Sequence, residues 1–245
     1  MSVVNLYEKI PKKFQKKPNE YKNYKALQIE VPCRIIFNGA SGSMKTNSML
    51  NVFRAMNCWS RIYLFCKNLE QPLYNWLIDE FESINKKVKR EVFTASDNLE
   101  DELPPLEMFN NEEQTLMIFD DIICESQYVL KTISNYFIRG RSKGISVFFI
   151  SQDYYKIPKV IRSNADYLIL KRVNTIADFN RILREYTLSV KLEELKKMYN
   201  ESTKNSKTDF FMIDLNTTDD KLKFRKNFEG INNSTIDTDD KKEIK

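Results

Sequence analysis

Hydrophobic positions along this 245-residue chain fall into short continuous runs, separated by segments in which apolar residues recur every three or four positions. The continuous runs predict buried strands. Strands that are apolar on both faces favour a mainly parallel sheet with helices on each side, which is an α/β fold. The predicted strands are CRIIFN (33–38), RIYLFC (61–66), EVFTA (91–95), TLMIFDDII (115–123), ISVFFISQ (145–152) and DYLILKR (166–172).

The segments between these strands carry the helical spacing. The segment 71–84 opens with Pro72, a residue favoured in the first helical turn, and places Leu73, Trp76, Leu77 and Phe81 on one face. Near the end of the chain, TDFFMIDL and DKLKFRKNF predict a C-terminal β-hairpin around Asn216–Asp220. The predicted helices are 45–56, 71–84, 126–138, a short one after Pro158, 175–186 and 190–200.

The flanking segments differ in composition from the predicted α/β domain at 31–229. Residues 1–30 are polar, rich in lysine and interrupted by Pro11 and Pro18, so we expect a basic, partly extended arm. From Gly230 onward aromatic residues are absent, which predicts a disordered polar tail over 230–245. The acidic stretch 96–114, with Pro104 and Pro105, predicts an excursion on the surface.

Composition excludes several classes of chemistry. The chain has no histidine, which excludes a Ser-His-Asp triad and zinc sites that contain histidine. Its four cysteines are scattered without a CxxC pair, and we interpret them as reduced and buried. No apolar run approaches a membrane span, and the first residues lack the features of a signal peptide, so we expect a soluble, intracellular protein.

Positive charge is unevenly spread. The net charge of the chain is +5, and residues 131–184 hold eleven Lys and Arg against three Asp, a net charge of +8. A basic face beside an active site favours a polyanionic partner such as DNA. An ordinary solvated surface is the alternative.

The sequence GASGSMKT (39–46) lies between a predicted strand and a predicted helix, the context of a P-loop. In such a loop successive amides point at phosphate oxygens, and the helix adds its positive end. Lys45 would reach the β- and γ-phosphates, and the Thr46 hydroxyl would bind Mg²⁺. The motif therefore predicts ATP and Mg²⁺, with contacts from Gly39, Ala40, Ser41, Gly42, Ser43, Met44, Lys45 and Thr46.

Met44 departs from the P-loop consensus GxxxxGK[ST], because it occupies the second glycine position. We expect Gly39 and Gly42 to carry the tight turn. We expect residue 44 to adopt a helical backbone, with its side chain pointing away from the nucleotide. A chance glycine-rich turn that caps a helix is the alternative.

Two further strand ends carry polar residues that fit this chemistry. The run LMIFDD ends in Asp120, which would hold Mg²⁺, and Asp121, which would polarise the attacking water. Gln152 ends another strand and would orient this water or sense the γ-phosphate. Because the carboxyl ends of parallel strands share one edge of a sheet, these residues should converge on the loop. Helix-capping aspartates and a simple strand terminator are the alternatives.

Arginine side chains complete the candidate chemistry. An arginine that enters the site of a neighbouring subunit stabilises charge on the transferring phosphoryl group. The segment FIRGRSKG (137–144) supplies Arg139 and Arg141, and Arg162 follows the next predicted strand. From the residues alone the three are not ranked, and each also suits an ordinary surface position.

Together, GASGSMKT, LMIFDD and the run IRGRSKGISVFFISQDYYKIPKVIRSNADYLIL resemble the FtsK/HerA branch of P-loop ATPases. More narrowly, they resemble the poxvirus-type genome-packaging ATPases of large DNA viruses and their virophage relatives, over about residues 30–228. The resemblance implies a RecA-like core, an oligomeric ring with the nucleotide between subunits, and an arginine donated in trans. Since Arg139 and Arg141 match the arginine-containing stretch, the resemblance favours them over Arg162. Asp121 stands where cellular relatives often carry Glu.

The function implied by this resemblance is ATP-driven movement of double-stranded DNA, without sequence preference, into a viral capsid. The implied partners are a capsid or portal component and further copies of this chain. The implied location is the host-cell cytoplasm or a virus factory, with the virion as a further location. Three alternatives stay open: another nucleic-acid motor such as a helicase or DNA pump, a non-hydrolysing virion assembly protein that binds nucleotide, and a small-molecule kinase.

Overall fold

The computed structural model describes residues 4–6, 9–11, 21–186 and 190–231. Strands form at each of the six predicted places. They are β1 (Arg34–Asn38), β2 (Arg61–Cys66), β3 (Phe93–Ser96), β4 (Thr115–Asp120), β5 (Ile145–Ser151) and β6 (Tyr167–Leu170), followed by β7 (Phe211–Asp214), β8 (Phe224–Lys226) and β9 (Glu229–Gly230).

Helices occupy the segments between the strands, as the spacing predicts. The α-helices are α1 (Tyr24–Leu27), α2 (Lys45–Met56), α3 (Pro72–Val88), α4 (Leu99–Glu102), α5 (Gln127–Arg139), α6 (Lys159–Ser163), α7 (Ile176–Arg184), α8 (Leu192–Thr203) and α9 (Asp220–Lys223). Short 3₁₀ helices are η3 (Leu106–Met108), η4 (Gly140–Lys143) and η5 (Tyr154–Lys156).

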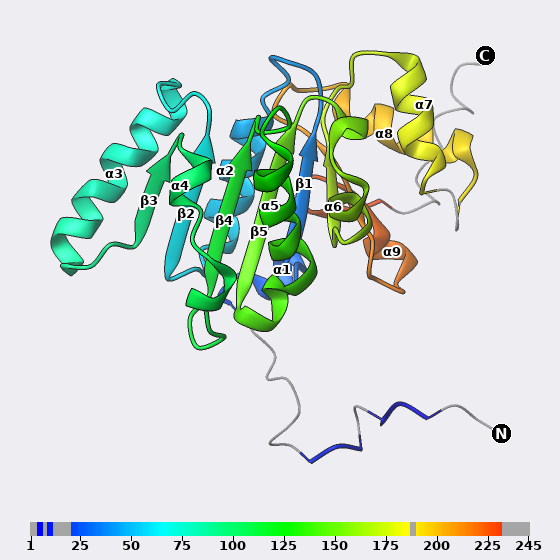
Figure 1. The fold of residues 1–245 in the computed structure, drawn as a ribbon. Helices are drawn as coiled ribbons and strands as arrows, with labels where there is room; N and C mark the ends of the chain where they lie inside the picture. Colours follow the sequence, from blue (N-terminus) through cyan, green and yellow to red (C-terminus); the bar gives the residue numbers. More distant parts are fainter. Residues whose placement is uncertain (1–3, 7–8, 12–20, 187–189, 232–245) are drawn as a thin grey trace, which may run out of the picture.

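Among the described residues, the strands form one nine-stranded sheet in the order β3-β2-β4-β5-β1-β6-β7-β8-β9 (Figure 1). The pairs from β3 to β6 are parallel, and those from β6 to β9 are antiparallel. The predicted hairpin is confirmed as β7 and β8, with α9 between them. The sheet is therefore mainly parallel, as the continuous apolar strands predict.

Both faces of the sheet are buried. In β5, Val147 and Phe149 pack into the core on one face, together with residues of α5, α6, α7 and α8. Phe148 and Ile150 pack into the core on the other face, together with residues of α1, α2 and α3. Alternating side chains of a single strand thus supply two cores, which is why such strands are apolar throughout.

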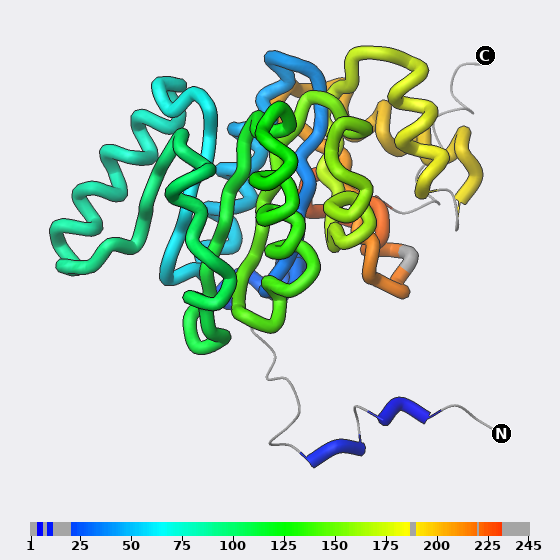
Figure 2. The backbone as a smooth tube through the Cα atoms, in the orientation of Figure 1, coloured from blue at the N-terminus to red at the C-terminus, as the bar shows by residue number. Residues whose placement is uncertain are grey.

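The parallel register sets which residues meet at the carboxyl edge of the sheet. Asn38 at the end of β1 lies beside Ser151 of β5, and Asp120 at the end of β4 lies beside Ile150. In Figure 2 the blue loop after β1 stands at the top of the molecule, at the same end as the loops that follow β4 and β5. The loop 39–44, Asp120 and Gln152 therefore share one edge.

Two of the predicted surface segments are partly integrated into the core. Leu27 and Ile29, within the predicted arm, are buried against α2 and the sheet. In the acidic stretch, Leu99, Leu106 and Phe109 are buried beside α5. Scattered apolar residues inside a charged segment anchor it to the fold, so the domain begins before residue 31 and includes much of 96–114. Residues 12–20 of the arm and 232–245 of the tail lie outside the described residues.

The cysteines are free, as predicted, but they are not all buried. Cys33 and Cys66 are buried, Cys58 is half-buried and Cys124 is exposed. Within the described residues, no helix is long and apolar enough to cross a membrane.

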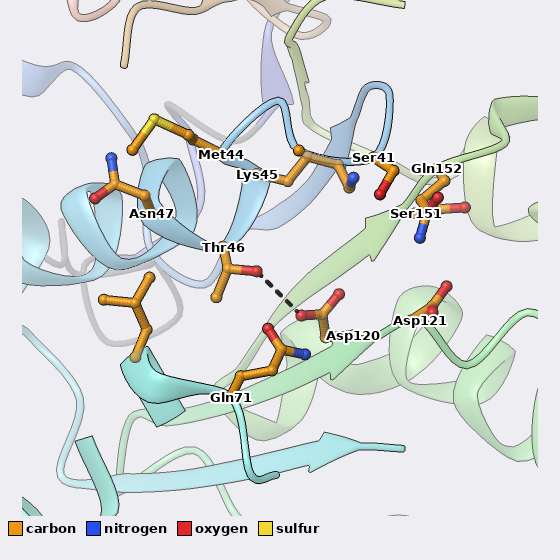
Figure 3. A pocket seen from close by; sticks show the side chains of 12 residues that line it. Ser41, Met44, Lys45, Thr46, Asn47, Gln71, Asp120, Asp121, Ser151 and Gln152 are labelled. Carbon is orange, nitrogen blue, oxygen red and sulfur yellow. Dashed lines mark hydrogen bonds between the residues drawn. The ribbon is translucent and has the colours of Figure 1, made fainter. Parts of the chain in front are cut away.

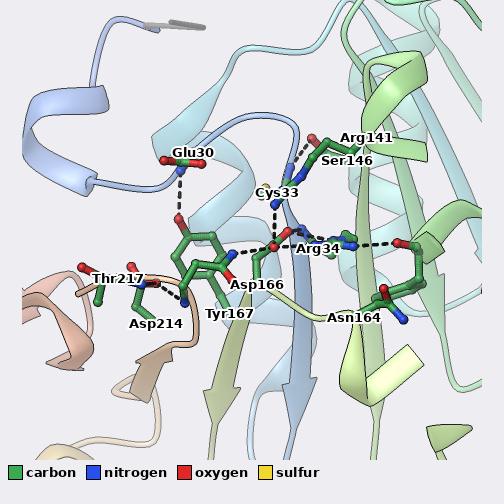
Figure 4. Close-up of polar contacts among 12 residues, drawn as sticks. Glu30, Cys33, Arg34, Arg141, Ser146, Asn164, Asp166, Tyr167, Asp214 and Thr217 are labelled. Carbon is green, nitrogen blue, oxygen red and sulfur yellow. Dashed lines mark hydrogen bonds and ion pairs between the residues drawn. The ribbon is translucent and has the colours of Figure 1, made fainter. Parts of the chain in front are cut away.

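The amino edge of the sheet is held by a buried carboxylate, Asp166, just before β6 (Figure 4). Arg34 donates to it from its backbone amide at 2.9 Å and from two guanidinium nitrogens at 2.9 and 2.7 Å. Arg141 donates at 2.7 Å and the Asn216 amide at 2.6 Å. A single carboxylate thus ties β1, η4 and the segment after β7 together.

We predict that Asp166→Ala lowers the free energy of unfolding by about 3–5 kcal/mol, because it leaves the part-buried Arg34 guanidinium without its carboxylate partner. Urea denaturation measures the change. The control is Glu82→Ala, which removes an exposed pair with Lys86 and should change stability by less than about 0.5 kcal/mol. An Asp166→Ala protein within about 1 kcal/mol of wild type would contradict this account of the amino edge.

Candidate functional site

The loop between β1 and α2 needs both of its glycines, for two different reasons. A Cβ on Gly39 would lie 2.5 Å from the Cβ of Lys171, so only glycine fits beside the end of β6. Gly42 has open space around it but a φ of +70°, which favours glycine. The Ala40 amide donates to the Arg172 carbonyl at 2.7 Å, which fixes the start of the loop.

Met44 corrects the expectation for this position. Its backbone has φ 65° and ψ 38°, which is the left-handed region and not the right-handed helix expected from its place before Lys45. The glycine of the consensus is therefore suited to this position because it adopts a left-handed backbone without steric cost. Figure 3 shows the Met44 side chain pointing away from Lys45 and Asp120, while Met44 is still one of the residues that line the cavity. The position of this side chain relative to a nucleotide stays a prediction.

Lys45 is half-buried within the loop. Its ammonium donates to the Ala40 carbonyl at 2.9 Å. Burial lowers the pKa of Lys45, and the carboxylates of Asp120 and Asp121 oppose this shift. A desolvated ammonium with one carbonyl partner is well suited to exchange that partner for a phosphate oxygen.

Asp120 is 5% exposed at the end of β4. Its Oδ2 atom accepts hydrogen bonds from Thr46 Oγ1 at 3.3 Å and from the Tyr74 hydroxyl at 2.5 Å. Burial raises the pKa of Asp120, while the bond from Tyr74 and the charge of Lys45 oppose the rise. The predicted partners Thr46 and Asp120 are therefore in direct contact.

Tyr74 is not among the residues that the sequence patterns indicate. The helical spacing assigns Leu73 and Trp76 to the buried face of α3, but these are 38% and 48% exposed, whereas Tyr74 is fully buried. The predicted face is therefore rotated from the observed one. The available signal is that 74, 77, 78 and 81 also follow helical spacing and place Tyr74 on the buried side.

Asp121 and Gln152 are exposed at the same cavity. Asp121 has a φ of 56°, a left-handed backbone that aspartate tolerates better than most residues but that still carries strain. Its amide donates to the Ile150 carbonyl at 3.3 Å. The cavity measures about 380 Å³ and is lined by Ser41, Gly42, Met44, Lys45, Thr46, Asn47, Gln71, Leu73, Asp120, Asp121, Ser151 and Gln152. The convergence expected of the loop and the two strand ends is thus present.

The oxygen donors at this site fit a magnesium ion that arrives with a nucleotide. Mg²⁺ is usually held by one or two carboxylates together with substrate phosphates. The Thr46 hydroxyl and the Asp120 carboxylate provide such a pair of oxygens. The described residues contain no group of three or more His, Cys, Asp or Glu side chains that could hold a resident metal.

The candidate arginines do not line this cavity in their own chain. Helix α5 runs from the carboxyl edge back to the amino edge, so Arg139 and Arg141 lie at the opposite end of the sheet, where Arg141 is bonded to Asp166. Arg162 donates to the Ile157 carbonyl and pairs with Glu185. A role in a neighbouring subunit's site therefore stays a prediction.

Comparison with known proteins places this chain in a viral family. The model of the family described as Poxvirus A32 protein matches residues 20–222. The chain belongs to this family. The predicted resemblance to the poxvirus-type packaging family is confirmed, while the likeness to virophage relatives stays a prediction.

Curated relatives of this chain are viral packaging proteins by name. The DNA packaging protein OPG160 of Vaccinia virus (strain Copenhagen) is 24% identical over 181 residues, which are 70% of this chain and 64% of the relative. The protein of the same name from Variola virus is 23% identical over the same shares of each chain. This chain thus matches less than two thirds of the relatives' own length.

Solved structures of viral NTPases share the fold. The genome packaging NTPase B204 from Sulfolobus turreted icosahedral virus 2, in complex with AMP, superimposes with a TM-score of 0.55 at 14% identity and covers 83% of this chain and 100% of its own. The same NTPase with AMPPCP gives a TM-score of 0.52 at 14% identity, over 82% and 99% of the two chains. At this identity the likeness shows the fold alone, and it confirms the predicted α/β fold with a mainly parallel sheet flanked by helices.

We predict that Met44→Gly raises the free energy of unfolding by about 1 kcal/mol, because a left-handed backbone costs methionine roughly 1–2 kcal/mol and costs glycine nothing comparable. Urea denaturation provides the measurement. Met108→Gly, at an exposed methionine outside the left-handed region, serves as the control and should be neutral or destabilising. A destabilised Met44→Gly protein would show that the loop does not store this strain.

Proposed function

We propose that this chain hydrolyses ATP and uses the energy to move double-stranded DNA into a viral capsid. The observation that carries the proposal is the meeting of the loop 39–46 with Asp120, Asp121 and Gln152 around one cavity of about 380 Å³. A cradle of amides, a lysine, a hydroxyl and two acids in this arrangement is what phosphoryl transfer requires.

Each residue has a task in this mechanism. The loop amides and Lys45 bind the β- and γ-phosphates, with Lys45 Nζ leaving the Ala40 carbonyl. Thr46 and Asp120 would hold the Mg²⁺ ion of a bound nucleotide, which would supply neutralising charge to the phosphate oxygens. Asp121 orients the attacking water and accepts its proton, and Gln152 helps to place that water. The strained backbone of Asp121 supports this role, because strain is retained where function requires it.

Two observations favour DNA as the polymer that is moved. The relatives that match 70% of this chain are named DNA packaging proteins. Residues 131–184 carry a net charge of +8, which suits contacts with phosphates. Because the sequence has no recognisable base-reading motif, we propose movement without sequence preference.

We extend this proposal to the wider assembly. We propose a ring of identical subunits in which an arginine of the neighbouring subunit completes each nucleotide-binding site. A capsid or portal component would be the docking partner of this ring. The motor would act in the host-cell cytoplasm or virus factory, on the virion during its filling. Among the described residues, no arginine lines the cavity, and this agrees with an arginine supplied by a second subunit.

We predict that duplex DNA stimulates ATP hydrolysis by the wild-type protein and that Lys45→Ala abolishes both ATP binding and ATP hydrolysis.

Asp121→Asn should lower kcat by about 10²–10⁴-fold and leave binding of an ATP analogue intact, because it removes the base alone. Steady-state hydrolysis with and without DNA provides the measurement. Lys86→Ala, an exposed lysine on α3, is the matched control.

Each contrary result selects an alternative. Full hydrolysis by Asp121→Asn would overturn the assignment of the base. Tight ATP binding without hydrolysis, in the presence and absence of DNA, would favour a non-hydrolysing assembly protein. Strong unwinding of a forked duplex would favour a helicase.

We predict that Arg139→Ala and Asp121→Asn are each inactive alone and that mixing the two proteins restores hydrolysis. Mixed rings would contain sites with an intact Asp121 next to a subunit with an intact Arg139. Arg162→Ala, tested in the same mixture, is the comparison, while Arg141 is set aside because its bond to Asp166 makes a stability effect unavoidable. Normal hydrolysis by Arg139→Ala alone would overturn the assignment of Arg139.

A further inference from the structure

Tyr74 connects helix α3 to the acid that ends β4. The ring is fully buried among the apolar residues that α2, α3 and the sheet share. Its hydroxyl donates to Asp120 Oδ2 at 2.5 Å, a shorter bond than the one from Thr46 at 3.3 Å. Among the contacts of Asp120 in the described residues, this is the closest.

Both hydroxyl groups bind the same oxygen of Asp120. Within the described part of the chain, Oδ1 accepts no hydrogen bond, and Figure 3 shows the second carboxylate oxygen pointing away from Thr46 on the cavity side. A carboxylate held at one oxygen can rotate little, so the other oxygen keeps a fixed direction. The direction it keeps is toward the place where a metal-bound phosphate chain would lie.

The first turn of α3 explains how Tyr74 is held in place. The helix starts at Pro72, and the Tyr74 amide donates to the Gln71 carbonyl at 2.9 Å. Gln71 and Leu73, which flank Pro72 at the start of this helix, line the cavity. The tyrosine therefore approaches Asp120 from α3, an element outside the loop 39–46 that supplies Thr46.

We propose that Tyr74 is a positioning residue for the metal-binding carboxylate: its hydroxyl anchors Asp120 Oδ2 so that Oδ1 is aimed at the magnesium ion of a bound nucleotide. This inference rests on the proposed function of the site. It implies that the Tyr74 hydroxyl strengthens binding of nucleotide with Mg²⁺ and leaves binding of metal-free nucleotide unchanged.

If Tyr74 had a purely structural role, the effect of removing its hydroxyl on nucleotide affinity would be different. If the hydroxyl only satisfies a buried carboxylate and fastens α3 to the sheet, its removal lowers stability equally in the presence and absence of Mg²⁺. The ratio of nucleotide affinities with and without the metal then stays at the wild-type value. This ratio therefore separates the two roles.

The test measures ADP affinity by isothermal titration calorimetry, once with MgCl₂ and once with EDTA, for wild type, Tyr74→Phe and Tyr136→Phe. Tyr136 is a matched control, since it is another buried tyrosine and its hydroxyl donates to the Pro104 carbonyl, while neither residue lines the cavity. We expect Tyr74→Phe to reduce the gain in affinity from Mg²⁺ about 10-fold or more, as loss of an outer partner of a metal ligand typically does. Affinities in EDTA should agree within about twofold across the three proteins, because no metal is then bound.

Further variants protect this test. Tyr74→Met also lacks the hydroxyl and should show the same loss if Tyr74→Phe does not fold. In an Asp120→Asn background, adding Tyr74→Phe should cause no further loss of the Mg²⁺ effect. A wild-type Mg²⁺ gain in a folded Tyr74 variant would overturn the positioning role. If the wild-type protein binds no nucleotide, or gains nothing from Mg²⁺, the proposed function fails as well.

Discussion

Parallel pairing of β1, β5 and β4 is the constraint on which the rest of the structure depends. Because Asn38 lies beside Ser151 and Asp120 beside Ile150, three strands end at one level. A slip of one residue would turn every apolar side chain to the opposite face, so the two buried cores hold this register. The P-loop, the acids and Gln152 come together as a consequence of how the sheet is packed.

The charged groups of the site are held in an environment that does not favour their charge. Burial lowers the pKa of Lys45 and raises that of Asp120, and each of the two partly offsets the shift of the other. The left-handed backbones of Met44 and Asp121 add strain at the same edge. Under the proposed function, a phosphate chain with its metal ion would supply charged partners for these groups, and the surrounding sheet would hold them ready for this substrate.

Much of this architecture could be predicted from the sequence, because the signals are local. The loop GASGSMKT and the strand LMIFDD lie in continuous stretches, and their convergence follows from the parallel topology alone. The backbone of Met44 could not be predicted by treating it as the first residue of a helix, since the left-handed turn belongs to the loop geometry. Tyr74 bonds to Asp120, which lies 46 positions further along the chain, and Asp166 bonds to Arg34, which lies 132 positions earlier. Hydrophobic periodicity does not reveal contacts between such distant positions.

The most direct test of the central claim is a crystal structure of this protein with AMPPCP and Mn²⁺, with the metal located by its anomalous signal. The account predicts phosphates within the loop 39–46, Lys45 Nζ on phosphate oxygens, and the metal between Thr46 and Asp120. An empty loop in crystals that contain the nucleotide elsewhere, or a cavity filled by the Met44 side chain, would contradict it.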